Sequence, residues 1–295
     1  MNNIKSVFSI KDLENLSGIK AHTIRIWEKR YNILKPMRTD TNIRYYDSYN
    51  LQKLLNVVLL HRHGYKISKI GTYPDEKIPQ LLREIISDKS AKHHAITSFK
   101  IAMLNFDQSL FLQTYDKLLS QKSFREIFKE VFLPLLDEIG FLWQTGTITP
   151  AHEHFISYLV RQKIYIQTEN LQVAPPENTD RVYVLFLPQY ELHELGLLYV
   201  NYEIALAGMK SIYLGESVPI SGLRDVKHLF KNVTYVTYLT VEPQADEVDQ
   251  YVSDFFKEIM DDDSQFWILG QRGKLVTPRT GVKLFQSIDA LVDHL

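Results

Sequence analysis

The spacing of hydrophobic and polar positions divides the chain into three segments. Residues 8 to 74 show short helical stretches of apolar residues that are separated by polar turns. Residues 75 to 174 keep the helical spacing almost without interruption, and the clearest apolar stripe consists of Phe124, Ile127, Phe128, Val131, Leu135 and Ile139. A stripe of this kind is typical of a helix packed against other helices. We therefore predict a compact four-helix bundle in the middle of the chain.

The third segment, residues 175 to 295, alternates short apolar strands with helical patterns. The strand-like runs are RVYVLFLP, KSIYLG, VTYVTYLTV and QFWILG, and the helical patterns include ELGLLYVNYEIALAGM and ADEVDQYVSDFFKEIM. A Pro-rich polar linker, QVAPPENTD, precedes the first run. Strands that alternate with helices predict a doubly wound parallel sheet of the Rossmann-like, flavodoxin-like type.

Composition limits the classes of protein that fit these patterns. Hydrophobic residues make up 45% of the 295 positions, which is enough for more than one core. The chain contains no cysteine, which excludes disulfides, thiolate metal sites and cysteine nucleophiles. The start, MNNIKSVFSIKDL, lacks the apolar core of a signal peptide, and no apolar run is long enough to cross a bilayer. We expect a cytoplasmic protein without a membrane partner.

Charge is distributed unevenly along the chain. Residues 1 to 70 contain 13 lysines and arginines against 5 acidic residues, although the whole chain has a net charge of -1. A small basic segment is suited to a polyanion, because contacts with phosphates release bound counterions. A solvated surface face is the alternative explanation that charge alone leaves open.

The N-terminal segment has the pattern of a helix, a turn and a second helix. In FSIKDLENLSGIKAHTIRIWEKRYNIL, apolar residues share one face on each side of a turn at Ser17-Gly18. The short, glycine-containing turn is typical of a helix-turn-helix. The second helix, from about residue 21 to 31, directs a set of polar side chains outward, namely His22, Thr23, Arg25, Lys29 and Arg30.

This stretch, followed by the polar hairpin-like loop PMRTDTN and by IRYYDSYNLQKL, resembles the winged-helix DNA-binding domain of the MerR family of transcriptional regulators. The resemblance covers about the first 70 residues. It implies that the second helix enters the major groove of a double-stranded DNA operator and that the wing holds phosphates. The candidate DNA-binding residues are His22, Thr23, Arg25, Arg30, Arg44 and Tyr45.

A second motif follows the first predicted strand of the third segment. In doubly wound sheets, ligands bind beyond the carboxyl ends of the strands. The loop QYELHELGL lies at such an end, and its spacing Glu191-x-His193-x-x-Gly196 resembles the cobalamin-binding motif of corrinoid proteins. The resemblance implies that His193 ligates cobalt from the lower side, with Glu191 accepting the proton on the other ring nitrogen. A surface histidine paired with a neighbouring acid is the alternative.

A third motif lies in the predicted bundle. Trp143 and the pair Glu153-His154 are separated by nine residues, as in the helical cap of cobalamin-dependent, light-responsive MerR-type regulators of the CarH and LitR group. The resemblance implies that Trp143, Glu153 and His154 face the upper side of the corrin ring, where an adenosyl group would lie. Thr149 and Pro150 predict the start of a helix just before the pair. A buried core aromatic and a solvated first turn are the alternatives.

Two further short stretches in the third segment correspond to parts of the cobalamin-binding motif. The wider family carries a Ser-x-Leu sequence and a later Gly-Gly pair, and the corresponding residues here are Thr237-Tyr238-Leu239 and Gly270-Gln271. By this resemblance Thr237, Leu239 and Gly270 join the cofactor site. A side chain at Gln271 would crowd the nucleotide tail of the cofactor, so a domain that has lost cobalamin binding is the alternative.

The residue after the motif tryptophan also departs from the group. In light sensors of this group a histidine at that position captures cobalt after light has removed the adenosyl group. This chain has Gln144, which is a poor cobalt ligand. Either His152 or His154 would have to substitute, or the lit state is not locked.

Together these features predict a multidomain α and α/β protein. Its predicted parts are a MerR-type winged-helix domain (1–74), a helical bundle that caps cobalamin (75–174) and a Rossmann-like cobalamin-binding domain (175–295). The predicted function is a regulator, most simply a repressor and not an enzyme, whose oligomeric state (dimer or tetramer) and DNA affinity respond to adenosylcobalamin and light. The alternatives are a MerR-type regulator that has lost its cofactor, and a corrinoid-dependent enzyme or methyl carrier.

Overall fold

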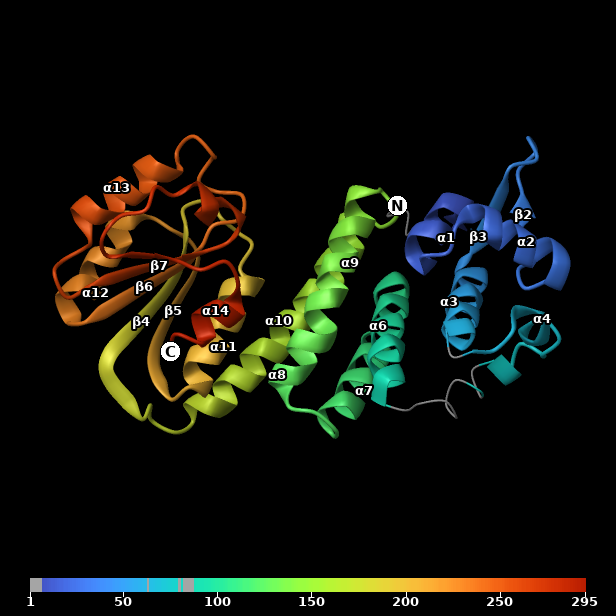
Figure 1. Ribbon diagram of the computed structural model, residues 1–295, viewed down its shortest axis with the longest axis horizontal. Coiled ribbons are helices and arrows are strands. Elements are labelled where there is room, and N and C mark those ends of the chain that lie inside the picture. The colour runs from blue at the N-terminus through green and yellow to red at the C-terminus, as the bar shows by residue number, and fades with distance from the viewer. Residues whose placement is uncertain (1–6, 63, 79–80, 82–87) are drawn as a thin grey trace. The chain divides into compact units, whose positions relative to one another are not determined.

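The computed structural model describes residues 7–62, 64–78, 81 and 88–295 of the chain (Figure 1). The chain divides into two compact units, Met1–Val160 and Arg161–Leu295, each with its own buried apolar residues. Within the described ranges, no helix combines the length and the apolarity needed to cross a membrane. The predicted division into three domains stays a proposal.

The first unit begins with a small winged helix-turn-helix. Its elements are β1 (Val7–Phe8), α1 (Ile10–Ser17), α2 (Ala21–Tyr31), β2 (Met37–Arg38), β3 (Arg44–Asp47), α3 (Ser48–Arg62) and α4 (Ile67–Ile70). The strands form a sheet of order β1-β3-β2. The Glu14 carboxylate in α1 accepts the N–H of Ala21 at 3.0 Å. That hydrogen bond, helped by Lys11, lowers the pKa of Glu14 to about 2, so an ionised side chain fixes the turn between the two helices.

The remainder of the first unit is helical. Its elements are α6 (Asp88–Asn105), α7 (Gln108–Leu119), α8 (Phe124–Ile127), a π-helical turn η1 (Phe128–Phe132), α9 (Leu133–Gln144) and the first part of α10 (Pro150–Gln172). The predicted apolar stripe from Phe124 to Ile139 is buried throughout. Rings from three helices meet in the core, where Phe99 lies 4.8 Å from Phe111 and 5.5 Å from Phe132 between ring centroids. The stripe therefore forms the bundle core, as its spacing predicts.

The second unit is built on a five-stranded parallel sheet of order β5-β4-β6-β7-β8. The strands are β4 (Asn178–Pro188), β5 (Met209–Val218), β6 (Val233–Tyr238), β7 (Gln265–Leu269) and β8 (Val282–Leu284). The first of them in the sequence lies second in the sheet, which is the flavodoxin-like order. The predicted fold class and its four strands are confirmed. The short edge strand β8 was not predicted, because three residues carry too little pattern.

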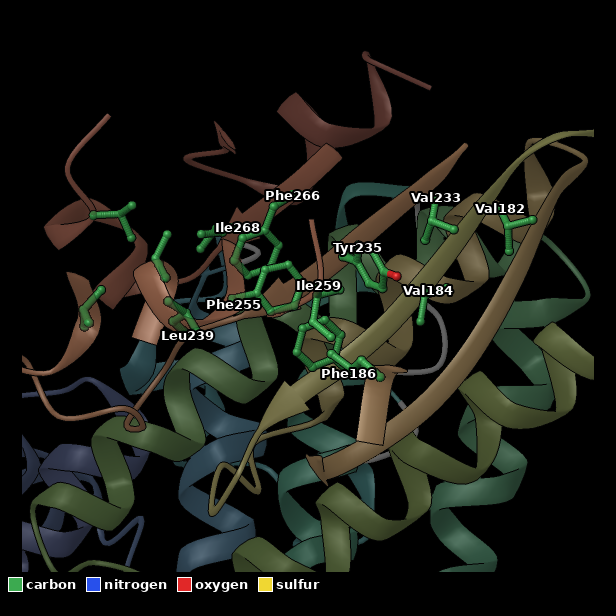
Figure 2. Packing of buried hydrophobic residues seen from close by; sticks show 14 residues of the cluster. Val182, Val184, Phe186, Val233, Tyr235, Leu239, Phe255, Ile259, Phe266 and Ile268 are labelled. Carbon is green, nitrogen blue, oxygen red and sulfur yellow. The ribbon is translucent and has the colours of Figure 1, made fainter. Parts of the chain in front are cut away.

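Helices cover both faces of this sheet (Figure 1). The elements α12 (Arg224–Leu229) and α13 (Val248–Glu258) pack on one face, and α11 (Leu195–Leu206) and α14 (Ile288–Val292) pack on the other. Along β4, Val184 and Phe186 join the α13 side, shown in Figure 2, whereas Leu185 joins the α11 side. Burial on both faces explains the nearly continuous apolar run of this strand.

The order of the strands also fixes where a ligand can bind. The connections from β4 lead to β5 on one side, whereas β6 lies on its other side. In open parallel sheets this reversal opens a crevice beyond the carboxyl ends of the two central strands. Here those strands are β4 and β6, whose residues Leu185 and Val236 are paired. The loops that follow Pro188 and Tyr238 therefore form the candidate site.

Candidate functional site

The carboxylate of Glu191 organises the loop that follows β4. The side chain is fully buried, and its Oε1 accepts the N–H of Leu192 at 3.0 Å, the N–H of His193 at 3.0 Å and the His193 ring nitrogen Nδ1 at 2.5 Å. Its Oε2 accepts the backbone N–H groups of Thr240, Val241 and Glu242 at 3.2, 2.6 and 2.9 Å. One side chain thus joins the two loops at the switch point of the sheet.

These hydrogen bonds determine the charge of Glu191. Burial on its own would raise the pKa of this carboxyl group, because it penalises the charged form. The backbone N–H groups of Glu242, Val241 and His193 outweigh burial and lower the pKa to about 2. The side chain is therefore an ionised acceptor at neutral pH.

An ionised Glu191 determines the tautomer of His193. A carboxylate only accepts hydrogen bonds, so Nδ1 of His193 carries the proton that lies between them. In the neutral imidazole, Nε2 then holds a lone pair, and a carboxylate on the other nitrogen makes it a stronger metal ligand. The His193 side chain is 61% exposed. The arrangement presents a single, oriented nitrogen ligand at the carboxyl end of β4.

Gly196 is the second residue of α11 (Leu195–Leu206), the helix that follows this loop, and it allows a close approach of β6. A Cβ atom at this position would lie 2.9 Å from the ring of Tyr238. Such a distance requires a shift of the ring or of the helix. The motif glycine therefore makes room for Tyr238, a contact that the spacing of the motif did not predict.

Thr237, Leu239 and Gly270 lie together at the ends of β6 and β7. The N–H of Leu239 bonds to the carbonyl of Leu269 at 2.8 Å, and Gly270 adopts a φ of +96°. A Cβ atom on Gly270 would lie 2.2 Å from the Leu239 carbonyl oxygen, so only glycine fits. The hydroxyl of Thr237 is buried and has no hydrogen-bond partner among the residues that the structure describes. A buried, unpaired hydroxyl of this kind suits a polar group supplied by a ligand.

Gln271 follows Gly270 at the start of the 3-10 turn η3 (Gln271–Leu275) and is exposed. Its side-chain oxygen accepts a hydrogen bond from Nζ of Lys274 at 3.0 Å. This contact gives the amide a partner on its own turn. The crowding of a nucleotide tail by Gln271 stays a prediction.

The candidate upper-face residues lie on the two last helices of the bundle. Trp143 is 54% exposed near the end of α9, so it is not the buried core aromatic of the alternative interpretation. Glu153 lies in the first turn of α10, where its carboxylate accepts the Ser157 hydroxyl at 2.7 Å and contacts Nδ1 of His154 at 3.0 Å. The His154 side chain is 79% exposed. Trp143 is thus accessible on α9, and Glu153 and His154 are accessible on α10.

The two residues considered as substitute ligands differ sharply in exposure. His152 is fully buried, stacks on Phe106 with ring centroids 4.8 Å apart, and contacts the Thr149 hydroxyl through Nδ1 at 2.8 Å. The ring of His152 is thus part of the bundle core, and the expectation that it could replace a capturing histidine stays a prediction. His154 keeps that role as a prediction. The side chain of Gln144 lies outside the described residues.

The candidate DNA-binding residues lie on α2 and in the wing. His22, Arg25 and Arg30 are exposed on α2, whose buried face carries Ile24 and Trp27. Thr23 is half-buried on the same helix. A face of polar and basic side chains on the second helix is the geometry that reads a major groove.

The wing is held to α2 by Glu28. Its carboxylate accepts Nε of Arg44 at 3.0 Å and the hydroxyl of Tyr46 at 2.9 Å. Tyr46 is fully buried, whereas Tyr45 on the same strand is half-buried and the Arg44 side chain is 36% exposed. Burial and the neighbouring Glu28 raise the pKa of the Tyr46 phenol, which stays protonated and donates. The sequence pattern pointed to Arg44 and Tyr45 but not to Glu28.

Family models match the winged helix-turn-helix and the helices that follow it. The model of the MerR HTH family regulatory protein matches residues 8–77, and that of the B12 binding domain matches residues 95–166. The HTH-type transcriptional repressor CarH of Myxococcus xanthus is 30% identical over 226 residues, which are 73% of this chain and 73% of that protein. The HTH-type transcriptional repressor CarA of the same organism is 25% identical over 218 residues, covering 73% and 70%.

A solved structure shares the fold. The monomethylamine corrinoid protein of Methanosarcina barkeri covers 69% of this chain and 97% of its own, with a TM-score of 0.56 and 12% sequence identity. At this identity the likeness shows the fold alone.

Proposed function

The chain belongs to the cobalamin-dependent MerR-type transcriptional regulators, and on this basis we propose that it is a repressor whose DNA affinity and oligomeric state are controlled by adenosylcobalamin and light. Control of transcription by cobalamin follows from the family. The observation that carries the proposal is the imidazole of His193, oriented by the buried carboxylate of Glu191 at the switch point of the sheet.

The residues present fit the cofactor. His193 would ligate cobalt, and the buried hydroxyl of Thr237 would bond to a polar group of the cofactor. In this proposal Gly196, Leu239 and Gly270 would line the crevice beyond β4 and β6, and the accessible side chains of Trp143, Glu153 and His154 would serve the upper face. Bound adenosylcobalamin supplies a cobalt–carbon bond that light can cleave.

Regulation would follow from linkage between binding and assembly. If one assembly state binds the cofactor better, the cofactor shifts the population toward that state by its differential affinity. Assembly states that present different numbers of the basic helix α2 differ in affinity for an operator, because each added phosphate contact releases counterions. Binding, assembly and DNA affinity are thereby coupled without a chemical reaction catalysed by the protein.

The first prediction tests the function as a whole. The full-length chain is expected to bind adenosylcobalamin and operator DNA in the dark, and green light is expected to change both the absorbance spectrum and the oligomer size. Absorbance, gel filtration and gel-shift measurements before and after light follow these changes. DNA binding without cobalamin colour would favour a regulator that has lost its cofactor, and colour without DNA binding would favour a corrinoid enzyme or methyl carrier.

The light response carries a specific expectation at position 144. Because glutamine is a poor cobalt ligand, dark incubation of the lit protein with fresh adenosylcobalamin should restore the dark oligomer readily, and Gln144→His should slow this recovery. Recovery is measured by gel filtration against time. A bleached spectrum with unchanged oligomer size and DNA affinity would contradict light sensing but not cobalamin binding.

The second prediction concerns the contacts with DNA. Arg44→Ala should weaken DNA binding and lower the slope of log affinity against log salt by about one, because a phosphate contact is lost. Arg25→Ala should change sequence preference. Gel-shift titrations at several salt concentrations measure both effects. Arg44→Lys, which keeps the charge, is the matched control, and unchanged affinity in both alanine variants would contradict the assignment.

A further inference from the structure

A second carboxylate, Glu194, follows His193 directly and is also buried. Its side chain is only 8% exposed. Glu194 is the N-cap residue of α11, yet its side chain makes no capping hydrogen bond to that helix. A carboxylate at this position usually bonds to the first N–H groups of its own helix. Its interactions therefore lie elsewhere, and they must offset the cost of burying a charge.

Glu194 is held by one cation and one phenol from different elements. Nε of Arg161 lies 2.9 Å from Oε1, and the hydroxyl of Tyr213 on β5 donates to Oε2 at 2.9 Å. Burial and then the Glu194 charge raise the pKa of the Tyr213 phenol, which keeps its proton for this bond. The Arg161 side chain as a whole is 36% exposed, but its Nε is buried beside the carboxylate.

The cation, Arg161, comes from a helix that also carries candidate site residues. Arg161 lies on α10, the helix that begins with Glu153 and His154 in its first two turns. His154 and Arg161 are seven residues apart, so they lie on one face of the helix at a separation of roughly 10 Å. The residue next to the proposed lower ligand therefore pairs with the part of α10 that belongs to the second unit.

We propose that Glu194 and Arg161 are positioning residues for His193. Their ion pair links the loop that carries His193 to α10. This inference rests on the proposed cobalamin-binding function. Glu191 and Glu194 flank His193 on both sides and anchor the loop to different elements. Glu191 fixes the imidazole through Nδ1 and the β6 loop. Glu194 fixes the following backbone against α10 and β5. The direction of Nε2 therefore depends on both anchors.

The third prediction tests this pair in the full-length chain. Arg161→Met and Glu194→Gln are each expected to lower adenosylcobalamin affinity about 10-fold, the scale typical of residues that orient a metal ligand. They should also reduce the fraction of bound cobalamin with the spectrum of histidine ligation. Because the two residues act as a unit, the double variant should be no worse than either single one. Titrations followed by visible absorbance measure both quantities.

Three variants separate positioning from general stability. Arg161→Lys keeps the charge and should regain most of the lost affinity. Tyr213→Phe removes one hydroxyl from the same carboxylate and should cause a smaller loss of the same kind, even where the charge variants fold poorly. Arg224→Met breaks an exposed ion pair of the same unit, in which a guanidinium nitrogen of Arg224 lies 2.6 Å from a carboxylate oxygen of Glu258. This variant should behave as the wild type.

The outcomes are distinguishable from failure of the proposed function. Wild-type protein that shows no histidine-ligated cobalamin spectrum would contradict the function itself, and the inference with it. A normal wild-type spectrum together with folded Arg161→Met and Tyr213→Phe proteins of unchanged affinity and spectrum would overturn only the positioning role. Weaker binding with an unchanged spectrum would overturn it as well, because a misplaced imidazole must alter the ligation.

Discussion

Replacement of His193 by alanine is expected to abolish the spectrum of histidine-ligated cobalamin and to reduce affinity for the cofactor. The imidazole is the nitrogen donor that Glu191 orients toward solvent at the end of β4. Without it, the loop would offer no nitrogen ligand to the cobalt of a bound cofactor. A titration with adenosylcobalamin in the dark, followed by absorbance, measures the loss.

The neighbouring residues provide the comparison for this variant. Glu191→Gln keeps the shape of the side chain but presents an amide to backbone N–H groups, so we expect weaker binding by about 10-fold or more. Leu192→Ala, on a neighbouring side chain that is 59% exposed, should bind as the wild type does. Equal cobalamin binding by wild type and His193→Ala would rule out His193 as the ligand.

The other large effect is expected at Gly270. An alanine there must adopt a φ of +96° and place its Cβ 2.2 Å from the carbonyl oxygen of Leu239. The unfavourable backbone conformation alone costs about 1–3 kcal/mol, and the clash with main-chain atoms adds to it because a backbone cannot rotate away as a side chain can. We expect Gly270→Ala to lower the free energy of unfolding of the second unit by more than about 3 kcal/mol, as measured by urea unfolding. We also expect it to lower cobalamin affinity, as measured by titration.

A matched glycine separates the two contributions at this position. Gly215 on β5 has a similar φ of +84°, but a Cβ there would lie 3.8 Å from the nearest atom, the ring of Tyr213, which is an ordinary contact. Gly215→Ala should therefore show only the conformational cost. If Gly270→Ala unfolds at the same urea concentration as Gly215→Ala, the close approach of Leu239 is not what requires glycine.

Local sequence patterns predicted those helices and strands that are determined by residues close together in the sequence. The apolar spacing gave the helix Ala21–Tyr31, the bundle stripe and the four longer strands, because each is decided by periodicity within a short window. The pair Glu191 and His193 was visible for the same reason, since two residues on one loop can meet. Short elements such as β8 carry too few residues for a period to be recognised.

The sequence could not predict contacts that depend on tertiary structure. Among the described residues, three of the six hydrogen bonds to the Glu191 carboxylate come from backbone N–H groups of residues 240 to 242, which have no side-chain signature. The Arg161–Glu194 pair joins two helices, and neither residue type stands out among the other charged residues. The burial of His152 likewise depends on Phe106, which comes from another part of the bundle. The types and spacing of residues identified the candidates, whereas the contacts of these residues depend on how the chain packs.

The hydrogen bonds of Glu28 have a consequence for the kind of DNA that this protein selects. Because Glu28 bonds to both Arg44 and Tyr46, the protein fixes the spacing between α2 and the wing. A duplex that contacts both elements must then adapt its groove width and curvature to that spacing. We expect sequences that bend or unstack at low cost to be favoured at base pairs that no side chain touches, which would place part of the operator's information in the stiffness of the double helix.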